Sequence, residues 1–212
     1  SHCVALGLCS PQLQISCGIS SGWRPFGPAR LVTHSKNNIL YALDGAPALD
    51  MYKRYLGQHM HDWAHARLLF SFEILDTSCR ETGLIRAVQA YNENDGSLIL
   101  TDDIQEGSYM RLMHASTNAL VGGAEAAMDQ ARKNIANTST SLAFVVSCVG
   151  RRIIMGQQSD EEIEAILPYL RASSHLSGFY AHGEFGTPAG QNQLPHILNE
   201  TLSVTLLSEM SC

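Results

Sequence analysis

Apolar and polar residues alternate in short segments over the first half of the chain, with the two-residue period of β-strands. We expect strands over residues 3–8 and 12–19, separated from a hairpin at residues 30–43 by a loop rich in glycine and proline. Within the hairpin, Asn37 or Asn38 can adopt the positive φ that a tight turn requires. Further strands are predicted over residues 66–75, 83–92, 97–104 and 108–114. Their short, turn-linked spacing favours antiparallel pairing.

Two longer segments have apolar residues three and four positions apart, which is the spacing of an amphipathic helix. The first covers residues 47–56, where Pro47 suits the opening turn and Gly57 suits the end of the helix. The second covers residues 115–134. Adjacent glycines at positions 122 and 123 allow this helix to approach a strand or a ligand closely, and tight packing is the interpretation we favour.

A third helix is predicted for residues 159–171, which have the clearest helical pattern in the chain. Ser159 and Glu162 have the spacing of a capping box, in which each side chain accepts a hydrogen bond from a free backbone N–H. Pro168 lies inside the pattern, so we expect a kink or an early end there.

The remaining apolar segments predict strands and complete the fold class. Residues 142–146 and 153–156 indicate two strands, which makes residues 147–152, SCVGRR, the loop between them. Two more strands are expected over residues 176–183 and 200–210, with a loop at residues 184–196. This order indicates an α+β fold, with a mainly antiparallel sheet packed against helices as an α/β sandwich.

The composition and net charge of the chain argue against some classes of binding partner. The 212 residues are 45% hydrophobic and 16% charged, which fits a globular chain. A net charge of -6 without a basic run argues against nucleic acid as a partner, and no apolar segment approaches the ~20 residues that cross a bilayer. The six cysteines form no CxxC pair, which argues against a zinc ribbon or a thioredoxin-like site. Their scatter and apolar neighbours favour reduced, mostly buried thiols and a cytoplasmic location over a disulfide framework.

A histidine-rich segment, HMHDWAH, carries His59, His61 and His65. His61 and His65 would share a helix face, which is a spacing that metal sites use. No HExxH pattern is present, and only Asp62 stands nearby as a further ligand. We therefore interpret the segment as a polar surface linker and predict no metal site.

Cys148, inside SCVGRR, is the candidate nucleophile. Catalysis would require a base and an orienting group close in space, and His175, His182 and His196 are the candidates. Gly150 and the arginines beside it could lower the thiol pKa. A small residue at the end of a strand is the interpretation we favour, so we predict no catalytic residue, with chemistry at Cys148 left open.

Binding of an anion fits the same segment better. Exposed backbone N–H groups beside Gly150, with Arg151 at hand, are typical of a carboxylate or phosphate site. In an extended chain Arg152 would point the opposite way, so only one of the two arginines would face such a site.

The segment GFYAHGEFG supplies Tyr180, His182 and Glu184, which would share one side of an extended chain. An aromatic face, a titratable ring and a carboxylate could line a pocket for a small polar molecule or a solvated strand face, and the pattern favours neither. Asn199 adds a polar group just before the last strand.

Taken together, several of these segments resemble the FIST family. GWRPFGPARLVTHSKNNILYALDGAPALDMYKRYLG resembles the opening of its C-terminal domain, SCVGRR with SDEEIEAI and GFYAHGEFG resembles the second half, and LNETLSVTLL resembles its closing strand. The resemblance gives a FIST C-terminal domain over residues 21–212. Residues 1–20 are similar to the tail of the preceding FIST N-terminal half, so the chain is interpreted as a piece of a longer protein.

The resemblance implies an intracellular sensory or signal-transduction module that binds a small ligand, such as an amino acid or another small polar molecule, and that is not an enzyme. It also implies an alternative, because some bacterial FIST proteins bind haem, sense nitric oxide and regulate a histidine kinase. The cofactor therefore stays open between none and haem. A histidine kinase or another signalling protein is the expected partner.

The family's motif positions fall on Asp44, Gly45, Cys148, Gly150, Arg151 and residues 178–184. Two departures point to a changed ligand preference: a tyrosine is usual where His182 stands, and the histidine expected just before the closing asparagine is displaced to His196. The predicted ligand-binding residues are Cys148, Gly150, Arg151, Tyr180, His182, Glu184 and Asn199.

Overall fold

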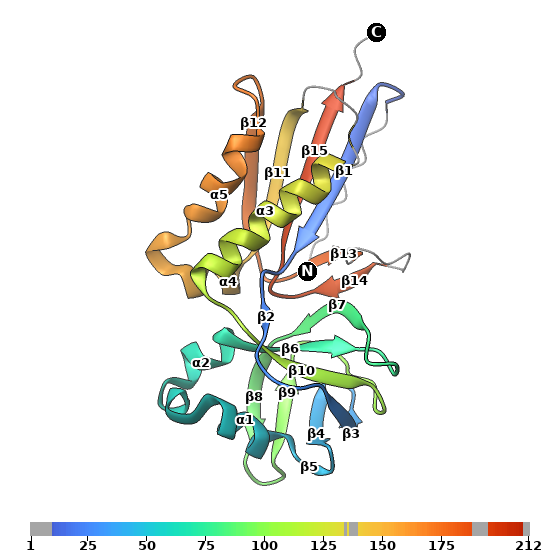
Figure 1. Cartoon of the computed structure of the whole chain (residues 1–212), viewed down its shortest axis with the longest axis vertical. Coiled ribbons are helices and arrows are strands. Elements are labelled where there is room, and N and C mark those ends of the chain that lie inside the picture. Colours follow the sequence, from blue (N-terminus) through green and yellow to red (C-terminus); the bar gives the residue numbers. More distant parts are fainter. Residues whose placement is uncertain (1–9, 134, 136–139, 188–194, 210–212) are drawn as a thin grey trace, which may run out of the picture.

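The structure, a computed structural model, describes residues 10–133, 135, 140–187 and 195–209. It has two lobes, which lie one above the other in Figure 1. The upper lobe is a four-stranded sheet with α3, α4 and α5, and the lower lobe is a nine-stranded sheet with α1 and α2. The strand predicted over residues 3–8 lies outside the described residues.

The upper sheet has the strand order β1-β15-β11-β12. Its strands are β1 (Leu13–Ser20), β15 (Leu202–Glu209), β11 (Thr140–Cys148) and β12 (His175–Ala181). β15 pairs antiparallel with β1 and β11, whereas β12 pairs parallel with β11. The helices are α3 (Thr117–Lys133), α4 (Val149–Met155) and α5 (Glu161–Ile166).

The lower sheet follows the order β7-β6-β10-β3-β4-β9-β8, with β2 and β5 paired outside this path. Its strands are β2 (Arg24–Pro25), β3 (Arg30–Lys36), β4 (Ile39–Leu43), β5 (Ala46–Pro47), β6 (Phe70–Leu75), β7 (Glu81–Arg86), β8 (Val88–Asn92), β9 (Ser97–Leu100) and β10 (Tyr109–His114). The helices are α1 (Ala48–Leu56) and α2 (Trp63–Leu69), and a small hairpin of β13 (Glu184–Gly186) and β14 (His196–Leu198) lies between the lobes.

Most predicted elements are confirmed, and the α+β class is correct. Asn37 takes φ 54 in the β3–β4 turn, and Gly57 ends α1 as expected. Part of the segment predicted as a strand at residues 66–75 is wrong, because α2 occupies it as far as Leu69. The Asp62 carboxylate accepts a hydrogen bond from the His65 N–H and starts that helix.

The prediction of a strand over residues 153–156 is also wrong, and this changes the topology. The segment belongs to α4, so SCVGRR leads from β11 directly into a helix. The helices α4 and α5 carry the chain across the sheet to β12, and such a crossover is what allows β12 to pair parallel with β11.

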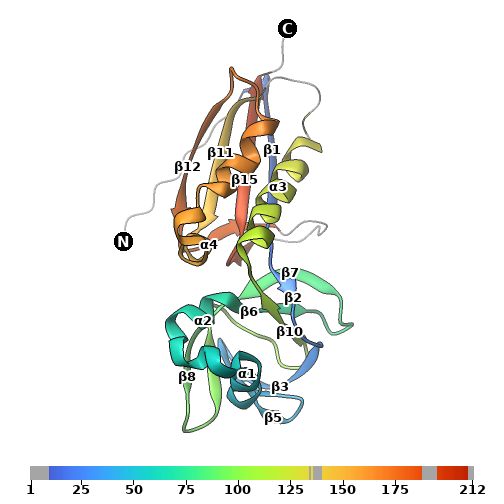
Figure 2. The same cartoon turned by 60° about the vertical axis from the view of Figure 1, so that its left-hand side comes forward.

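The two faces of the upper sheet have different surroundings. α3 and α5 cover one face, which we call the covered face, as both views show (Figures 1 and 2). Its side chains form a core that includes Ala143, Val145, Leu202, Val204 and Leu206. Among the described residues, no helix covers the opposite face, which we call the open face.

Close packing of α3 on β1 depends on small residues. A Cβ atom added at Gly18 would lie 1.9 Å from the Ala127 carbonyl oxygen of α3. Two positions earlier in β1, Ser16 donates a hydrogen bond of 2.6 Å to the Ala131 carbonyl oxygen. Gly123 of α3 lies against Gly22 in the same way, which confirms the interpretation of tight packing for Gly123, whereas Gly122 faces open space.

Within the described part of the chain, no helix is both long and apolar enough to cross a membrane.

Candidate functional site

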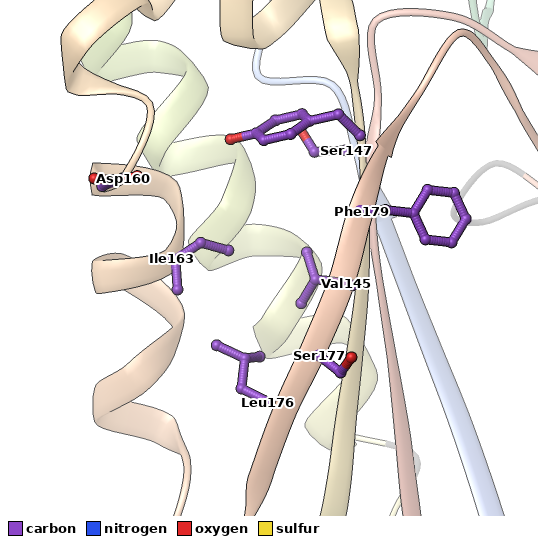
Figure 3. A pocket seen from close by; sticks show the side chains of 9 residues that line it. Val145, Ser147, Asp160, Ile163, Leu176, Ser177 and Phe179 are labelled. Carbon is purple, nitrogen blue, oxygen red and sulfur yellow. The ribbon is translucent and has the colours of Figure 1, made fainter.

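A groove of about 310 Å³ lies between α5 and the edge strand β12 on the covered face. Its apolar lining comes from Val145, Ile163 and Leu176, whose side chains face the space between the helix and the strands (Figure 3). Polar groups come from Ser147 on β11 and from Asp160, the residue that precedes α5. A volume of this size is at the lower end of the range for small-molecule sites.

Tyr180 of β12 also lines the groove. Its hydroxyl lies 3.5 Å from the Ser159 carbonyl oxygen, and the Arg152 guanidinium lies 5.0 Å from its ring centre. Burial raises the pKa of the Tyr180 hydroxyl, so this group stays a neutral donor at physiological pH. Tyr180 therefore contacts both Arg152 of α4 and the backbone just before α5.

Arg151 is fully buried and does not line the groove. Its Nε donates a 2.6 Å hydrogen bond to Glu162 of α5, and its Nη atoms donate to the carbonyl oxygens of Ser21 and Leu120. Ser147 donates to the other oxygen of Glu162 at 2.9 Å. The protein thus supplies its own carboxylate to Arg151, and in this structure the guanidinium is not open to a ligand.

This arrangement corrects the predicted capping box. Asp160 is the residue at the start of α5, and it makes no side-chain cap hydrogen bond. Glu162 points inward to Ser147 and Arg151 and does not cap the helix. The prediction at Pro168 is confirmed, because α5 ends at Ile166 and continues only as a short 3-10 turn.

Cys148 lies on the other side of the sheet from Ser147, at the end of β11. Its Sγ is 3.8 Å from a carboxylate oxygen of Glu200, and burial raises the pKa of the thiol to about 12. Activated cysteines have the opposite shift. The recorded side-chain neighbour of this thiol is the Glu200 carboxyl group. Of the bases proposed from the sequence, His175 is exposed at the far end of β12, His182 is exposed just after Ala181, and His196 begins β14. No hydrogen bond between any of the three and Cys148 is found among the described residues.

Two buried carboxyl groups gather beside Cys148. Glu200 has φ 58, and burial raises its pKa to about 7. Glu184 accepts a hydrogen bond from the Thr201 hydroxyl through one oxygen, while its other oxygen is buried without a hydrogen-bond partner. Burial raises the pKa of Glu184 to about 7 as well. Gly150 allows this crowding, because a Cβ atom there would lie 2.5 Å from Glu200.

The structure separates residues that the sequence analysis placed on one side of a strand. β12 ends at Ala181, so Tyr180 lines the groove on the covered face while Glu184 begins β13 beside Glu200. His182 is exposed between the two strands. The prediction that these three side chains share one side is therefore wrong.

Asn199 connects the two lobes. Its side-chain oxygen accepts a 2.8 Å hydrogen bond from the Thr101 hydroxyl of the lower lobe. Nearby, Arg86 donates to the Ile197 carbonyl oxygen at 3.3 Å and forms an ion pair with Asp102 at 2.9 Å. This polar junction holds the hairpin segment against the lower lobe.

Several of these residues were not predicted as site residues from the sequence, namely Ser147, Asp160, Glu162 and Glu200. Glu162 had a local signal, but that signal suggested a helix cap. For the histidine-rich segment, the described residues contain no cluster of three or more metal-binding side chains.

Comparison with known proteins agrees with the resemblance. The FIST C domain model matches residues 48–187, and the FIST N domain model matches residues 1–46. No curated protein and no solved structure matches the chain significantly. FIST domains are sensory modules of signal transduction that bind small ligands. Because the FIST C match covers more than half of the sequence, the chain belongs to the FIST family.

Proposed function

We propose that the protein is a sensory module that binds a free amino acid, or a small polar molecule of similar charge pattern, in the groove between α5 and β12. The observation that carries this proposal is the groove itself, which combines an apolar floor with charged groups of both signs at its margin. Family membership supports the sensory role.

The charged side chains at the margin of the groove match the ammonium and carboxylate groups of an amino acid. Asp160 is exposed, lines the groove and can accept hydrogen bonds from an ammonium group. Arg152 is exposed above the Tyr180 ring and can pair with a carboxylate. Val145, Ile163 and Leu176 would then contact an apolar side chain.

Thermal-shift and calorimetric titration with single amino acids and with simple amines and carboxylates tests the proposal. A ligand at a hundredfold excess over its dissociation constant adds about 2.7 kcal/mol to the free energy of unfolding, which is a clear rise in Tm. Asp160→Asn should abolish that rise. Glu164→Gln is the matched control, because it removes an exposed carboxylate from the same helix region outside the groove lining.

Ile163→Phe, which fills the groove, should also abolish binding while the fold persists by circular dichroism. No response to any compound, or a response that both Asp160→Asn and Ile163→Phe leave intact, would contradict the proposal.

Haem sensing with a histidine kinase as partner stays an alternative prediction, and no contact among the described residues favours it. Addition of haem followed by an absorption spectrum separates the two: a Soret band lost on replacement of a single histidine would favour the alternative. The absence of catalysis at Cys148 likewise stays a proposal, supported by its raised thiol pKa.

A further inference from the structure

The open face of the upper sheet carries apolar side chains that the described fold leaves exposed. Ile15 on one edge strand is 54% exposed and Phe179 on the other is 58% exposed, while Phe144 and Leu207 lie partly exposed between them. Phe144 and Phe179 contact each other edge to face at 5.9 Å. Side chains of this face alternate with those that α3 and α5 bury. The central strand β11 is apolar on both sides and the edge strand β1 is mainly apolar on the open face, while β15 and β12 mix apolar with hydroxyl and imidazole groups there.

Antiparallel strands commonly leave one sheet face to water, but that face is then mostly polar, whereas this one carries exposed aliphatic and aromatic side chains. Within the described part of the hairpin, Gly186 lies against Ile19 at the lower end of the open face. Above that contact, the exposed aromatic and aliphatic groups form the kind of patch that marks an interaction surface.

We propose that the open face is a docking surface for a second copy of this chain, which would place two upper sheets face to face. The chemistry of the face favours a copy of itself as the occupant. Between its ends the face has no Lys, Arg, Asp or Glu, because the open-face positions of β1, β15, β11 and β12 carry apolar, hydroxyl, thiol or imidazole side chains. An isologous contact between two such faces brings no like charges together.

The available area limits the size of this contact. Four strands about 4.8 Å apart and about eight residues long present roughly 500 Å² per copy, or about 1,000 Å² in the dimer. That value is at the lower end for specific interfaces, so the dimer should form reversibly and depend on concentration.

Sedimentation or light scattering on the whole chain, from about 1 μM to about 1 mM, tests the proposal. The wild type should shift from monomer to dimer. Ile15→Lys and Phe179→Lys should each raise the dissociation constant by about a hundredfold, because each substitution occurs twice in an isologous interface. Both side chains are exposed in the monomer, so the fold should survive these changes.

Ile153→Lys is the matched control, since Ile153 of α4 is 53% exposed and lies outside the open face. A chain that stays monomeric throughout, or a dimer that Ile153→Lys weakens as much as Ile15→Lys does, overturns the proposal. In the monomeric case the face is left to a different protein.

Two exposed cysteines give an independent measurement. Cys17 lies on the open face opposite Thr205, and Cys79 lies in the turn between β6 and β7 of the lower lobe. Alkylation of Cys17, followed by peptide mass spectrometry, should slow several-fold as the protein is concentrated, while the rate at Cys79 stays constant. Equal rates at both thiols at every concentration would contradict dimerisation through this face.

Discussion

The two faces of the upper sheet use the same strands in opposite ways. At the end of β11, Ser147 points to the covered face and reaches a buried ion pair between Arg151 and Glu162. The next residue, Cys148, points to the other side and reaches Glu200, a buried carboxyl group whose pKa is raised. Adjacent residues of β11 thus reach two different charge environments. On the covered face the Glu162 carboxylate is neutralised by Arg151, and on the other side burial favours the neutral form of Glu200.

This difference suggests that the covered face provides stability, while the open face and its lower end can respond to a proton or a partner. On the covered face every group of the cluster has a partner: Arg151 donates to three acceptors and Glu162 accepts from two residues. On the other side, a Glu184 oxygen is buried and unpaired. A buried carboxylate oxygen without a partner destabilises the folded protein, and protonation of the carboxyl group removes that cost.

Replacement of Arg151 should give the largest effect. Arg151→Ala leaves Glu162 charged and buried, so the free energy of unfolding should fall by about 3–5 kcal/mol in urea denaturation. The adjacent, exposed Arg152→Ala should cost less than about 1 kcal/mol. The double variant Arg151→Met/Glu162→Leu should recover most of the loss, and a single-variant loss equal to that of Arg152→Ala would show that the pair is not structural.

Substitution of two neighbouring leucines of β15 allows a direct comparison of the two faces. Leu206 is 1% exposed under α3, and Leu207 faces the open side. Leu206→Ala should lower the free energy of unfolding by about 3 kcal/mol, because it removes buried surface and leaves a cavity. Leu207→Ala, measured at low protein concentration, should cost about 1 kcal/mol or less. Equal losses would mean that the open face is covered within the monomer.

The dependence of stability on pH should reveal the buried carboxyl groups. The pKa of Glu200 in the folded protein is about 7, above its ordinary value of 4.5, so the folded state favours the neutral acid. Its contribution is therefore fully present below about pH 4.5 and is lost as the pH rises toward about 7. Relative to Glu200→Gln, the wild type should lose about 3 kcal/mol between pH 4.5 and pH 8.

Glu164→Gln serves as the control for that titration, because Glu164 is exposed on α5. Its pH profile should follow that of the wild type. If the Glu200→Gln profile also follows the wild type, the carboxylate of Glu200 is neutralised by a partner that compensates its burial.

Local patterns predicted much of this fold because they report local physics. Alternation over residues 12–19 and the spacing in residues 47–56 and 115–134 gave β1, α1 and α3. The short apolar run at residues 153–156 fits both the helical and the strand period, and the prediction of a strand there is wrong. Nothing local in β1 or β11 tells which of two apolar faces a helix will cover.

The candidate site was less predictable because its contacts are distant in sequence. Cys148 and Glu200 are 52 residues apart, and Arg151 meets Ser21 across 130 residues. The pattern around Gly150 predicted a site for an anionic ligand, whereas in the structure Gly150 and Arg151 are buried against the chain's own Glu200 and Glu162. Tyr180 is the predicted site residue that lines the groove, and the roles of the others in ligand binding stay predictions.

The smallest predicted effect concerns two adjacent glycines on different sides of α3, one of the helices that pack on the covered face. A Cβ atom at Gly123 would lie 2.8 Å from Gly22, whereas nothing lies within 4 Å of one at Gly122. Gly122→Ala should therefore raise the free energy of unfolding by about 1 kcal/mol, because alanine restricts the unfolded chain and favours the helix. Gly123→Ala should lower it, since the loop before β2 must move. If both substitutions stabilise the protein, the contact between α3 and Gly22 is looser than the structure shows, and the covered face depends less on close approach of this helix than on its apolar core.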